Sequence, residues 1–248
     1  EWIVEYMVQN SLGRLWIEKR ISEDYSLKEV DLARKYGWKY YLEEAEQEEE
    51  VSSHLIEERK ERRFLNLEEI TFMDPSMGSG HILVYAYDLL MELYLEEGYT
   101  RRDAAQSIIK NNLYGLDIDK RAYQLASFSL FMKAREDDRR ILSRNIKLNL
   151  NYFIDSKEID RDLLVYLGNE DKIIEKELNN LLDLFEHAKE LGSILIIDDE
   201  YDLEKMESYV ATINEDKILP MDLPKVKKLQ NSLLHIIDLS KKLSNKYN

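Results

Sequence analysis

The chain has 248 residues, 44% of them hydrophobic, no cysteine and a formal net charge of −15. This composition supports a buried core in one large or two small domains, and it excludes disulfides and thiolate metal sites. There is no apolar run long enough to span a bilayer, and no basic face of the kind that neutralises nucleic-acid phosphates. We therefore expect a cytoplasmic chain that has no membrane partner and does not bind DNA tightly by itself.

Most of the chain is predicted to be helical, because only eight glycines and three prolines interrupt long stretches of helically spaced apolar residues. In the first region, residues 1–67, we expect a helix over residues 2–19 and an acidic, solvated helix over residues 42–63. The residues of the first helix that should face inward are Ile3, Met7, Leu12, Leu15 and Trp16.

The second region, residues 68–155, alternates strands and helices. A short apolar run at residues 70–73, bounded by Asp-Pro, predicts a buried parallel strand. Further along we expect helices at residues 81–97, 101–111 and 120–135, and strands at residues 113–119 and 145–150. This order predicts an α/β fold, namely a partial Rossmann-like, doubly wound sheet between large helical N- and C-terminal regions.

The first strand of this sheet is expected to lie at an edge, since the strand that would flank it in a complete doubly wound sheet is missing from the pattern. We predict that this edge is covered by a short strand at residues 193–197, by the C-terminal helices or by a second copy of the chain. The last alternative implies a homo-oligomer.

The third region, residues 156–248, has a helical pattern to which the sequence assigns no role. Two amphipathic helices in it are expected to pack as a hairpin. Their inward-facing residues are Ile173, Ile174, Leu178, Leu181, Leu182 and Phe185 in the first helix, and Val226, Leu229, Leu233, Ile236, Ile237 and Leu243 in the second.

The turn after the first strand reads Asp-Pro-Ser-Met-Gly-Ser-Gly-His over residues 74–81. Gly78 and Gly80 allow the backbone to turn sharply and to approach a ligand closely, and the helix that follows presents its first amide N–H groups. Asp74 ends the strand and can meet a positively charged amino group. The segment therefore predicts a nucleotide-type cofactor, S-adenosylmethionine, over the carboxyl ends of the strands. His81 is expected to shape the turn by hydrogen bonding rather than to catalyse.

Asp117 ends the second strand, where a carboxylate can accept hydrogen bonds from both hydroxyls of a ribose. A structural alternative is that Asp117 and Asp119 cap the helix that starts at Lys120. Because Asp74 and the glycine turn support a cofactor, we favour the ligand role for Asp117 and the cap for Asp119. No group of residues predicts a metal site.

Together, Asp-Pro-x-x-Gly-Ser-Gly-His and the later Gly-Leu-Asp-Ile-Asp resemble the motifs of the S-adenosylmethionine-dependent adenine-N6 DNA methyltransferases. The resemblance implies that the methionine part of the cofactor is bound by Asp74, Pro75, Gly78, Ser79 and Gly80. It also implies that Asp117 binds the ribose and that Ile118 packs on the adenine. The contact to the adenine ring that is expected after the third strand stays open between Asn151 and Asp155.

Other phrases resemble the large PglX-type methyltransferases of BREX phage-resistance systems. They lie at residues 2–8, 10–16, 38–47 and 111–115, and the resemblance runs from Glu1 to about residue 140. The first phrase is similar to the helix after a Thr-Pro in the motif that closes over the cofactor in such enzymes. Residues 1–67 would therefore include a lid-like segment.

The catalytic motif of this family, Asn/Asp-Pro-Pro-Tyr/Phe, is absent, because the only prolines are Pro75, Pro220 and Pro224. That motif holds the target amine and offers an aromatic platform to the flipped base. Its absence and the initial Glu1 predict an N-terminal piece of a longer adenine-specific DNA methyltransferase of a restriction-modification or phage-defence system. Such a piece would bind S-adenosylmethionine, contain no catalytic residue and be inactive alone, while its parent would bind DNA and other defence-system subunits.

Two other classes of function stay open. The chain could be a non-catalytic interaction module on a degenerate methyltransferase fold, or a methyltransferase that acts on a small molecule or a protein. The residues encoded after Asn248 in the parent gene distinguish these classes, because only a DNA-modifying parent requires Asn-Pro-Pro-Tyr.

Overall fold

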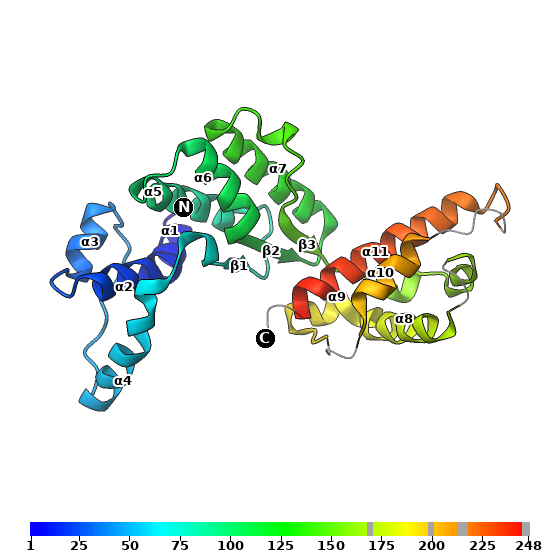
Figure 1. Cartoon of the computed structure of the whole chain (residues 1–248), viewed down its shortest axis with the longest axis horizontal. Coiled ribbons are helices and arrows are strands. Elements are labelled where there is room, and N and C mark those ends of the chain that lie inside the picture. Colours follow the sequence, from blue (N-terminus) through cyan, green and yellow to red (C-terminus); the bar gives the residue numbers. More distant parts are fainter. Residues whose placement is uncertain (168–170, 198–200, 213–217, 245–248) are drawn as a thin grey trace. The chain divides into compact units, whose positions relative to one another are not determined.

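The computed structural model describes residues 1–167, 171–197, 201–212 and 218–244. Helices make up most of the chain, and they accompany a small three-stranded sheet (Figure 1). The chain divides into two compact units. The first comprises Glu1–Leu116 and Arg121–Leu150, and the second comprises Asp117–Lys120 and Asn151–Asn248. Among the described residues, no helix has the length and apolar character needed to cross a membrane.

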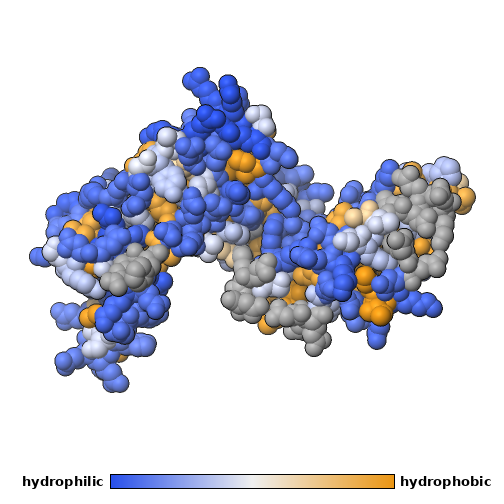
Figure 2. Space-filling view, in the orientation of Figure 1, coloured by the Kyte–Doolittle hydropathy of each residue, from blue (hydrophilic) through white to orange (hydrophobic). Residues whose placement is uncertain are grey.

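Helices precede the sheet in the first unit. They are α1 (Trp2–Val8), the π-helical η1 (Gln9–Gly13), α2 (Arg14–Glu23), α3 (Glu29–Lys35), α4 (Glu49–Arg59), and the 3₁₀ turns η2 (Lys60–Phe64) and η3 (Leu67–Glu69). Since α1, η1 and α2 follow one another without a break, the predicted helix over residues 2–19 is confirmed. On the face shown in Figure 2, hydrophilic residues dominate and apolar ones form small patches.

The inward face predicted for this first helix is only partly correct. Leu12 and Trp16 are buried and Leu15 is half-buried, whereas Ile3 and Met7 are about half exposed. These two residues lie on α1, which packs against the rest of the unit through another side and buries Val8.

The acidic helix predicted for residues 42–63 begins later than expected, at Glu49. The Leu42 N–H donates to the Asn10 side chain at 2.8 Å, and the Glu44 N–H donates to the Glu29 carboxylate at 3.1 Å. Side chains distant in sequence therefore satisfy the backbone donors of Leu42 and Glu44, and this competes with helix formation there.

The sheet has the order β1-β2-β3, formed by β1 (Phe72–Asp74), β2 (Leu113–Asp117) and β3 (Asn149–Tyr152). β1 and β2 are parallel, and Asp74 lies opposite Gly115. β1 is the terminal strand of this sheet, as the sequence predicts. The strand predicted at residues 193–197 is wrong: the segment is a 3₁₀ turn, η9 (Gly192–Ile194), followed by extended chain whose Leu195 and Ile197 are buried.

Helices connect the strands in the predicted order. They are α5 (His81–Glu96), α6 (Arg101–Ser107), the π-helical η4 (Ile108–Asn112), α7 (Lys120–Asp137) and the 3₁₀ turn η5 (Ile141–Ser143). α5 lies at the centre of the core and buries Leu83, Ala86, Tyr87, Leu89, Leu90, Met91, Leu93 and Tyr94. Burying a large apolar side chain contributes about 1.5–3 kcal/mol, so α5 anchors the turn that precedes it.

The second unit is helical. Its elements after β3 are η6 (Ser156–Glu158), η7 (Arg161–Tyr166), α8 (Lys172–Leu184), η8 (Phe185–His187), α9 (Ala188–Leu191), η9, α10 (Leu203–Ala211) and α11 (Leu223–Ser244). The apolar face predicted for α11 is fully buried, and so is that of α8 except for the exposed Ile173 and the half-buried Ile174. Ile173 lies in the first turn of α8, where its N–H donates to the capping Asp171.

The predicted hairpin of two helices is wrong, because a third helix takes part. α10, which the sequence pattern did not reveal, packs along α11 and also contacts α8. Its apolar residues Met206, Tyr209 and Val210 are buried. α10 has only nine residues, which is less than three helical turns. Its apolar pattern is therefore too short to predict a separate helix.

Candidate functional site

The turn between β1 and α5 lies in the first unit. The Asp74 side chain is buried, and its Oδ1 accepts a hydrogen bond from the Ser76 N–H at 3.0 Å. The Met77 N–H donates to the Leu116 C=O of β2 at 3.0 Å, and the Gly80 N–H donates to the Met77 C=O at 2.8 Å. These bonds attach the turn to the neighbouring strand. The predicted site residues that share it are Asp74, Pro75, Gly78, Ser79 and Gly80.

Two glycines give this turn its shape. Gly78 and Gly80 have left-handed backbones, with φ of 52° and 84°, which glycine adopts without strain. A Cβ on Gly78 would meet no described atom within 4 Å, whereas a Cβ on Gly80 would lie 3.1 Å from the Cα and the Cβ of Ala126. Gly78 therefore leaves space beside the turn, and Gly80 allows α5 and α7 to pack closely.

The N-terminus of α5 faces the same turn and has no side-chain cap. Its first N–H groups and the positive end of the helix dipole favour a carboxylate or a phosphate. The His81 side chain is exposed, and its Nδ1 lies 2.6 Å from the Ser79 Oγ. This local hydrogen bond agrees with the expectation that His81 shapes the turn.

Gly115 supports the turn from β2, a role that the sequence analysis did not predict. A Cβ on Gly115 would lie 2.5 Å from the Met77 Sδ, 2.8 Å from the Leu150 Cδ2 and 3.0 Å from the Leu83 Cδ1. No larger residue fits there unless these side chains move. The signals for Gly115 were its place in the phrase at residues 111–115 and at the start of Gly-Leu-Asp-Ile-Asp.

A groove of about 570 Å³ runs beside β1 in the first unit. Its lining residues are Tyr6, Met7, Asn10, Ser11, Leu12 and Leu15 on one wall, and Thr71, Phe72, Met73, Asp74, Pro75 and Ile82 on the other. Tyr6 and Met7 of the segment predicted to be lid-like thus line a groove that reaches Asp74 and Pro75. Trp2, at the start of the same helix, is 58% exposed.

Two amide side chains of η1 hold this wall in place. Gln9 is buried, accepts the Tyr40 N–H at 2.8 Å and donates to the Tyr85 hydroxyl of α5 at 2.7 Å. Asn10 donates to the Tyr40 C=O at 2.7 Å and accepts the Leu42 N–H at 2.8 Å. Single π-helical turns inside α-helices are frequent at functional sites. Sequence reasoning assigned neither residue a role, although Asn10 and Tyr40 lie in two of the phrases quoted above.

Asn112 fixes the chain that enters β1. Its amide is fully buried, and its Nδ2 donates to the Leu67 C=O at 2.6 Å and to the Ile70 C=O at 2.7 Å. Its Oδ1 accepts a hydrogen bond from the Tyr94 hydroxyl at 2.9 Å. Asn112 thereby sets the position from which β1 runs to Asp74. This residue too was visible only as part of the phrase at residues 111–115.

Asp117 and Ile118 belong to the second unit. The Asp117 Oδ1 accepts the Asp119 N–H at 2.8 Å, and the Asp117 C=O accepts the Phe153 N–H at 2.9 Å. The first bond closes a local turn immediately before α7, whereas a helix cap would accept an N–H from the first turn of α7 itself. Ile118 is 55% exposed and so offers an apolar surface to a ligand. The cap by Asp119 stays a prediction.

The two candidates after β3 differ in their surroundings. Asn151 is buried, whereas Asp155 is half-buried and its Oδ1 accepts the Lys189 N–H at 2.9 Å. Asp155 therefore has a structural contact within the second unit. In the part of the chain that the structure describes, no group of three or more His, Asp or Glu side chains is arranged to hold a metal ion.

Comparisons with known proteins agree with the motifs in this turn. The family model of the MmeI DNA-methyltransferase domain matches residues 45–157. The chain is 37% identical over 249 residues to the adenine-specific methyltransferase PglX of Lacticaseibacillus casei (strain Zhang), with 100% of this chain and 20% of the relative covered.

A second relative is the adenine-specific methyltransferase BrxX of Escherichia coli O9:H4 (strain HS). It is 39% identical over 220 residues, which cover 80% of this chain and 17% of the relative. The chain thus spans about a fifth of the length of the curated relatives that it matches. By sequence, it is related to the PglX-type adenine-specific methyltransferases and corresponds to a part of such a protein.

Proposed function

We propose that the chain is the S-adenosylmethionine-binding part of an adenine-N6 DNA methyltransferase of a restriction-modification or phage-defence system, with β1, β2 and β3 in a Rossmann-like core. The turn at residues 74–81 carries this proposal. There a buried strand-end carboxylate, a left-handed Gly78 with open space beside it and the uncapped N-terminus of α5 lie together. The relation to PglX and BrxX supports the proposal.

The methionine part of the cofactor would lie at this turn. The Asp74 carboxylate would bind its ammonium group, and the N-terminus of α5 would attract its carboxylate. Gly78 lets the backbone approach the ligand, because the space beside it is open. Pro75 and Ser79 complete the binding segment, and the groove beside β1 reaches it through Pro75.

The adenosine part would lie at the end of β2. Asp74 is opposite Gly115 in the register, and β2 continues from there by two residues to Asp117, which would bind the ribose. Ile118 would pack on the adenine ring, which would cover an apolar side chain that is now exposed. Asn151 or Asp155 would supply the polar contact to the ring, and Asp155 also accepts the Lys189 N–H.

We propose further that methyl transfer requires residues from outside this chain, because the chain contains no Asn-Pro-Pro-Tyr and no two consecutive prolines. DNA and other defence proteins would be partners of the whole protein, which would act in the cytoplasm. This chain alone would bind DNA weakly, since a net charge of −15 is repelled by phosphates.

Calorimetry with S-adenosylmethionine tests the proposal. A charge-assisted hydrogen bond contributes roughly 1.5–3 kcal/mol, so Asp117→Ala should weaken binding about tenfold to a hundredfold. Asp119→Ala is the matched control, and it should keep the wild-type affinity. Equal affinities for the wild type and Asp117→Ala would refute the ribose assignment. A wild-type chain that does not bind the cofactor would instead favour the interaction module.

A further inference from the structure

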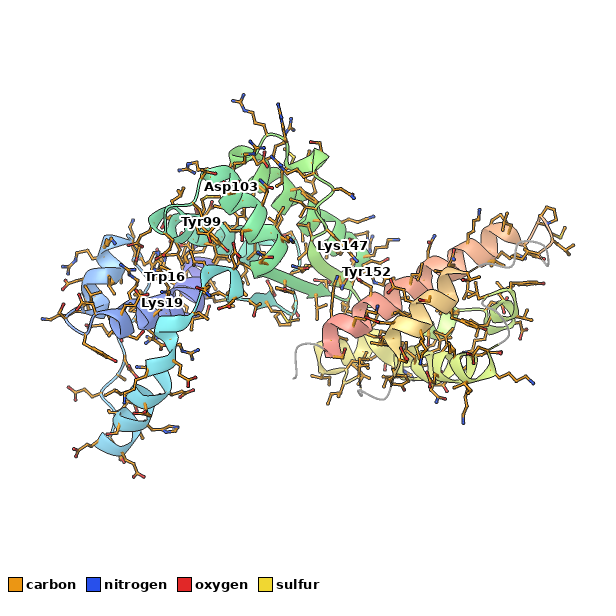
Figure 3. The ribbon with its side chains drawn as sticks, in the orientation of Figure 1. Trp16, Lys19, Tyr99, Asp103, Lys147 and Tyr152 are labelled. Carbon is orange, nitrogen blue, oxygen red and sulfur yellow. The ribbon has the colours of Figure 1, made fainter. Side chains whose placement is uncertain are left out.

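His235 on α11 contacts the end of β3 within the second unit. Its Nε2 lies 2.7 Å from the C=O of Tyr152, and the centroids of the two rings are 4.2 Å apart with 34° between the ring planes. Figure 3 labels Tyr152, where β3 ends. A carbonyl oxygen only accepts hydrogen bonds, so the His235 Nε2 carries a proton and donates it.

The chain next to Tyr152 also contacts Asp117, the residue proposed to bind the ribose. Phe153, the residue after Tyr152, is buried and donates its N–H to the Asp117 C=O at 2.9 Å. The Lys120 Nζ, at the start of α7, lies 5.6 Å from the centroid of the Tyr152 ring, at cation–π distance. Residues 151–153 therefore lie between α11 and residues 117–120, which carry Asp117 and Ile118.

The charge state of His235 suits this contact. Burial lowers the pKa of His235 below its ordinary value, and the positive charges of Lys242 and Lys120 act in the same direction. The hydrogen bond to Tyr152 and the charge of Asp238 act in the opposite direction and are outweighed. At neutral pH the ring is therefore neutral, and its one N–H, on Nε2, donates to the Tyr152 C=O.

We propose that His235 is a positioning residue for the adenosine half of the methyl donor: through Tyr152 it holds residues 151–153 against the loop of Asp117 and Ile118. This inference rests on the proposed function, since it requires adenosine to bind at that loop. It gives the C-terminal helical region a role that the sequence did not assign, namely support of one half of the cofactor site.

Two ligands and three variants test the inference. S-adenosylmethionine contains both the adenosine part and the amino-acid part that the proposed site would bind. 5′-Methylthioadenosine contains the adenosine part but lacks the amino-acid part. Replacing His235 by leucine leaves the Tyr152 C=O without its donor, and a lost hydrogen bond of this kind corresponds to a roughly tenfold loss of affinity. His235→Leu should therefore weaken both ligands by the same factor, because the loosened contact lies on the adenosine side.

His235→Gln should restore affinity for both ligands, because a glutamine amide can place an N–H where the Nε2–H stood. The matched control is Leu229→Ala, which removes a buried side chain of α11 and lowers the melting temperature. Leu229 has no hydrogen bond to β3, so this variant should bind both ligands as the wild type does. Binding is measured by calorimetry below the melting temperature of each variant, with the fold of each checked by circular dichroism.

Three outcomes would overturn the inference. If the wild type binds both ligands and His235→Leu binds them equally well, His235 does not position the site. If Leu229→Ala loses as much affinity as His235→Leu, or if His235→Gln fails to restore it, the effect is one of general stability. If the wild type binds neither ligand, the proposed function itself fails and the inference fails with it.

Discussion

Gly80 lies against Ala126 so closely that a Cβ on the glycine would be 3.1 Å from the Ala126 Cα. Because the obstacle includes backbone and the Gly80 φ is positive, neither a rotamer change nor a small shift of a side chain can make room. Gly78 in the same turn also has a positive φ but lies beside open space. The two glycines therefore serve different purposes, and substitution can separate them.

Gly80→Ala should destabilise the first unit by about 2–4 kcal/mol, through backbone strain and a close contact with α7. Gly78→Ala should cost only about 1–2 kcal/mol, because it adds strain without a clash. Urea unfolding measures both values. A cost for Gly78→Ala that equals or exceeds the cost for Gly80→Ala would contradict this distinction.

Gly115→Ala should destabilise the chain by about 1–3 kcal/mol, because the new methyl group would overlap with Met77. The nearest atom belongs to a flexible side chain, so shortening that side chain should relieve the overlap. A double-mutant cycle with Met77→Ala measures this, and the two costs should sum to more than the cost of the double variant. Additive costs would show that Met77 does not limit the space at Gly115.

Asn112→Ala should destabilise the chain by about 2–4 kcal/mol, since it removes three hydrogen bonds of a fully buried amide, two to carbonyls and one from the Tyr94 hydroxyl. Asn111→Ala is a matched control. Asn111 is half-buried and its amide donates to the Ser107 Oγ at 3.0 Å, so its loss should cost below about 1 kcal/mol. Similar losses for the two variants in thermal unfolding would argue against a special role for Asn112.

The stability of the second unit should depend on pH through His235. Burial lowers the pKa of this histidine from its ordinary 6.5, so the unfolded chain binds the proton more tightly than the folded chain does. The contribution to the free energy of unfolding is therefore complete above about pH 6.5 and is lost as the pH falls through the lowered pKa. Urea titrations at several pH values should show a smaller loss toward acid in His235→Gln than in the wild type. Identical pH profiles would refute this.

β1 is the terminal strand of the described sheet, and the apolar Met7 of α1, which lines the groove beside β1, is about half exposed. Because terminal strands and apolar faces promote association, we expect the wild type to form a dimer at high concentration. Met7→Glu should shift light scattering toward the monomer. Ile56→Glu, on the exposed side of α4, should leave the association unchanged. A wild type that stays monomeric would exclude self-association through this surface.

Residues close in sequence were enough to predict the helices around the turn at residues 74–81. The errors in predicted helix boundaries arise where contacts come from residues distant in sequence. The boundaries of α5 and the start of α7 at Lys120 follow from Gly80, Gly98 and the apolar periodicity, all of which are local. The delayed start of α4 depends on Asn10 and Glu29, which reach residues 42–48 from elsewhere in the chain. No periodicity of residues 42–48 could reveal those partners.

The candidate site shows the same division. Asp74, Gly78 and Gly80 were found because strand, turn and helix follow one another directly in the sequence. Gln9 and Asn112 were missed, because a buried amide looks like any exposed amide until its partners are known. Gln9 bonds with Tyr40 and Tyr85, and these contacts arise only when three separate segments pack.

The arrangement of the three tryptophans gives the chain a built-in optical reporter. Trp16 and Trp38 are buried, and the Trp38 ring lies against Gly13, whereas Trp2 is exposed on the helix that lines the groove. A soluble quencher such as iodide would therefore reduce the emission of Trp2 selectively. The fraction of the emission that iodide quenches would report the exposure of Trp2, and thus of α1. Closure of this helix over a ligand would therefore lower that fraction, without any added label.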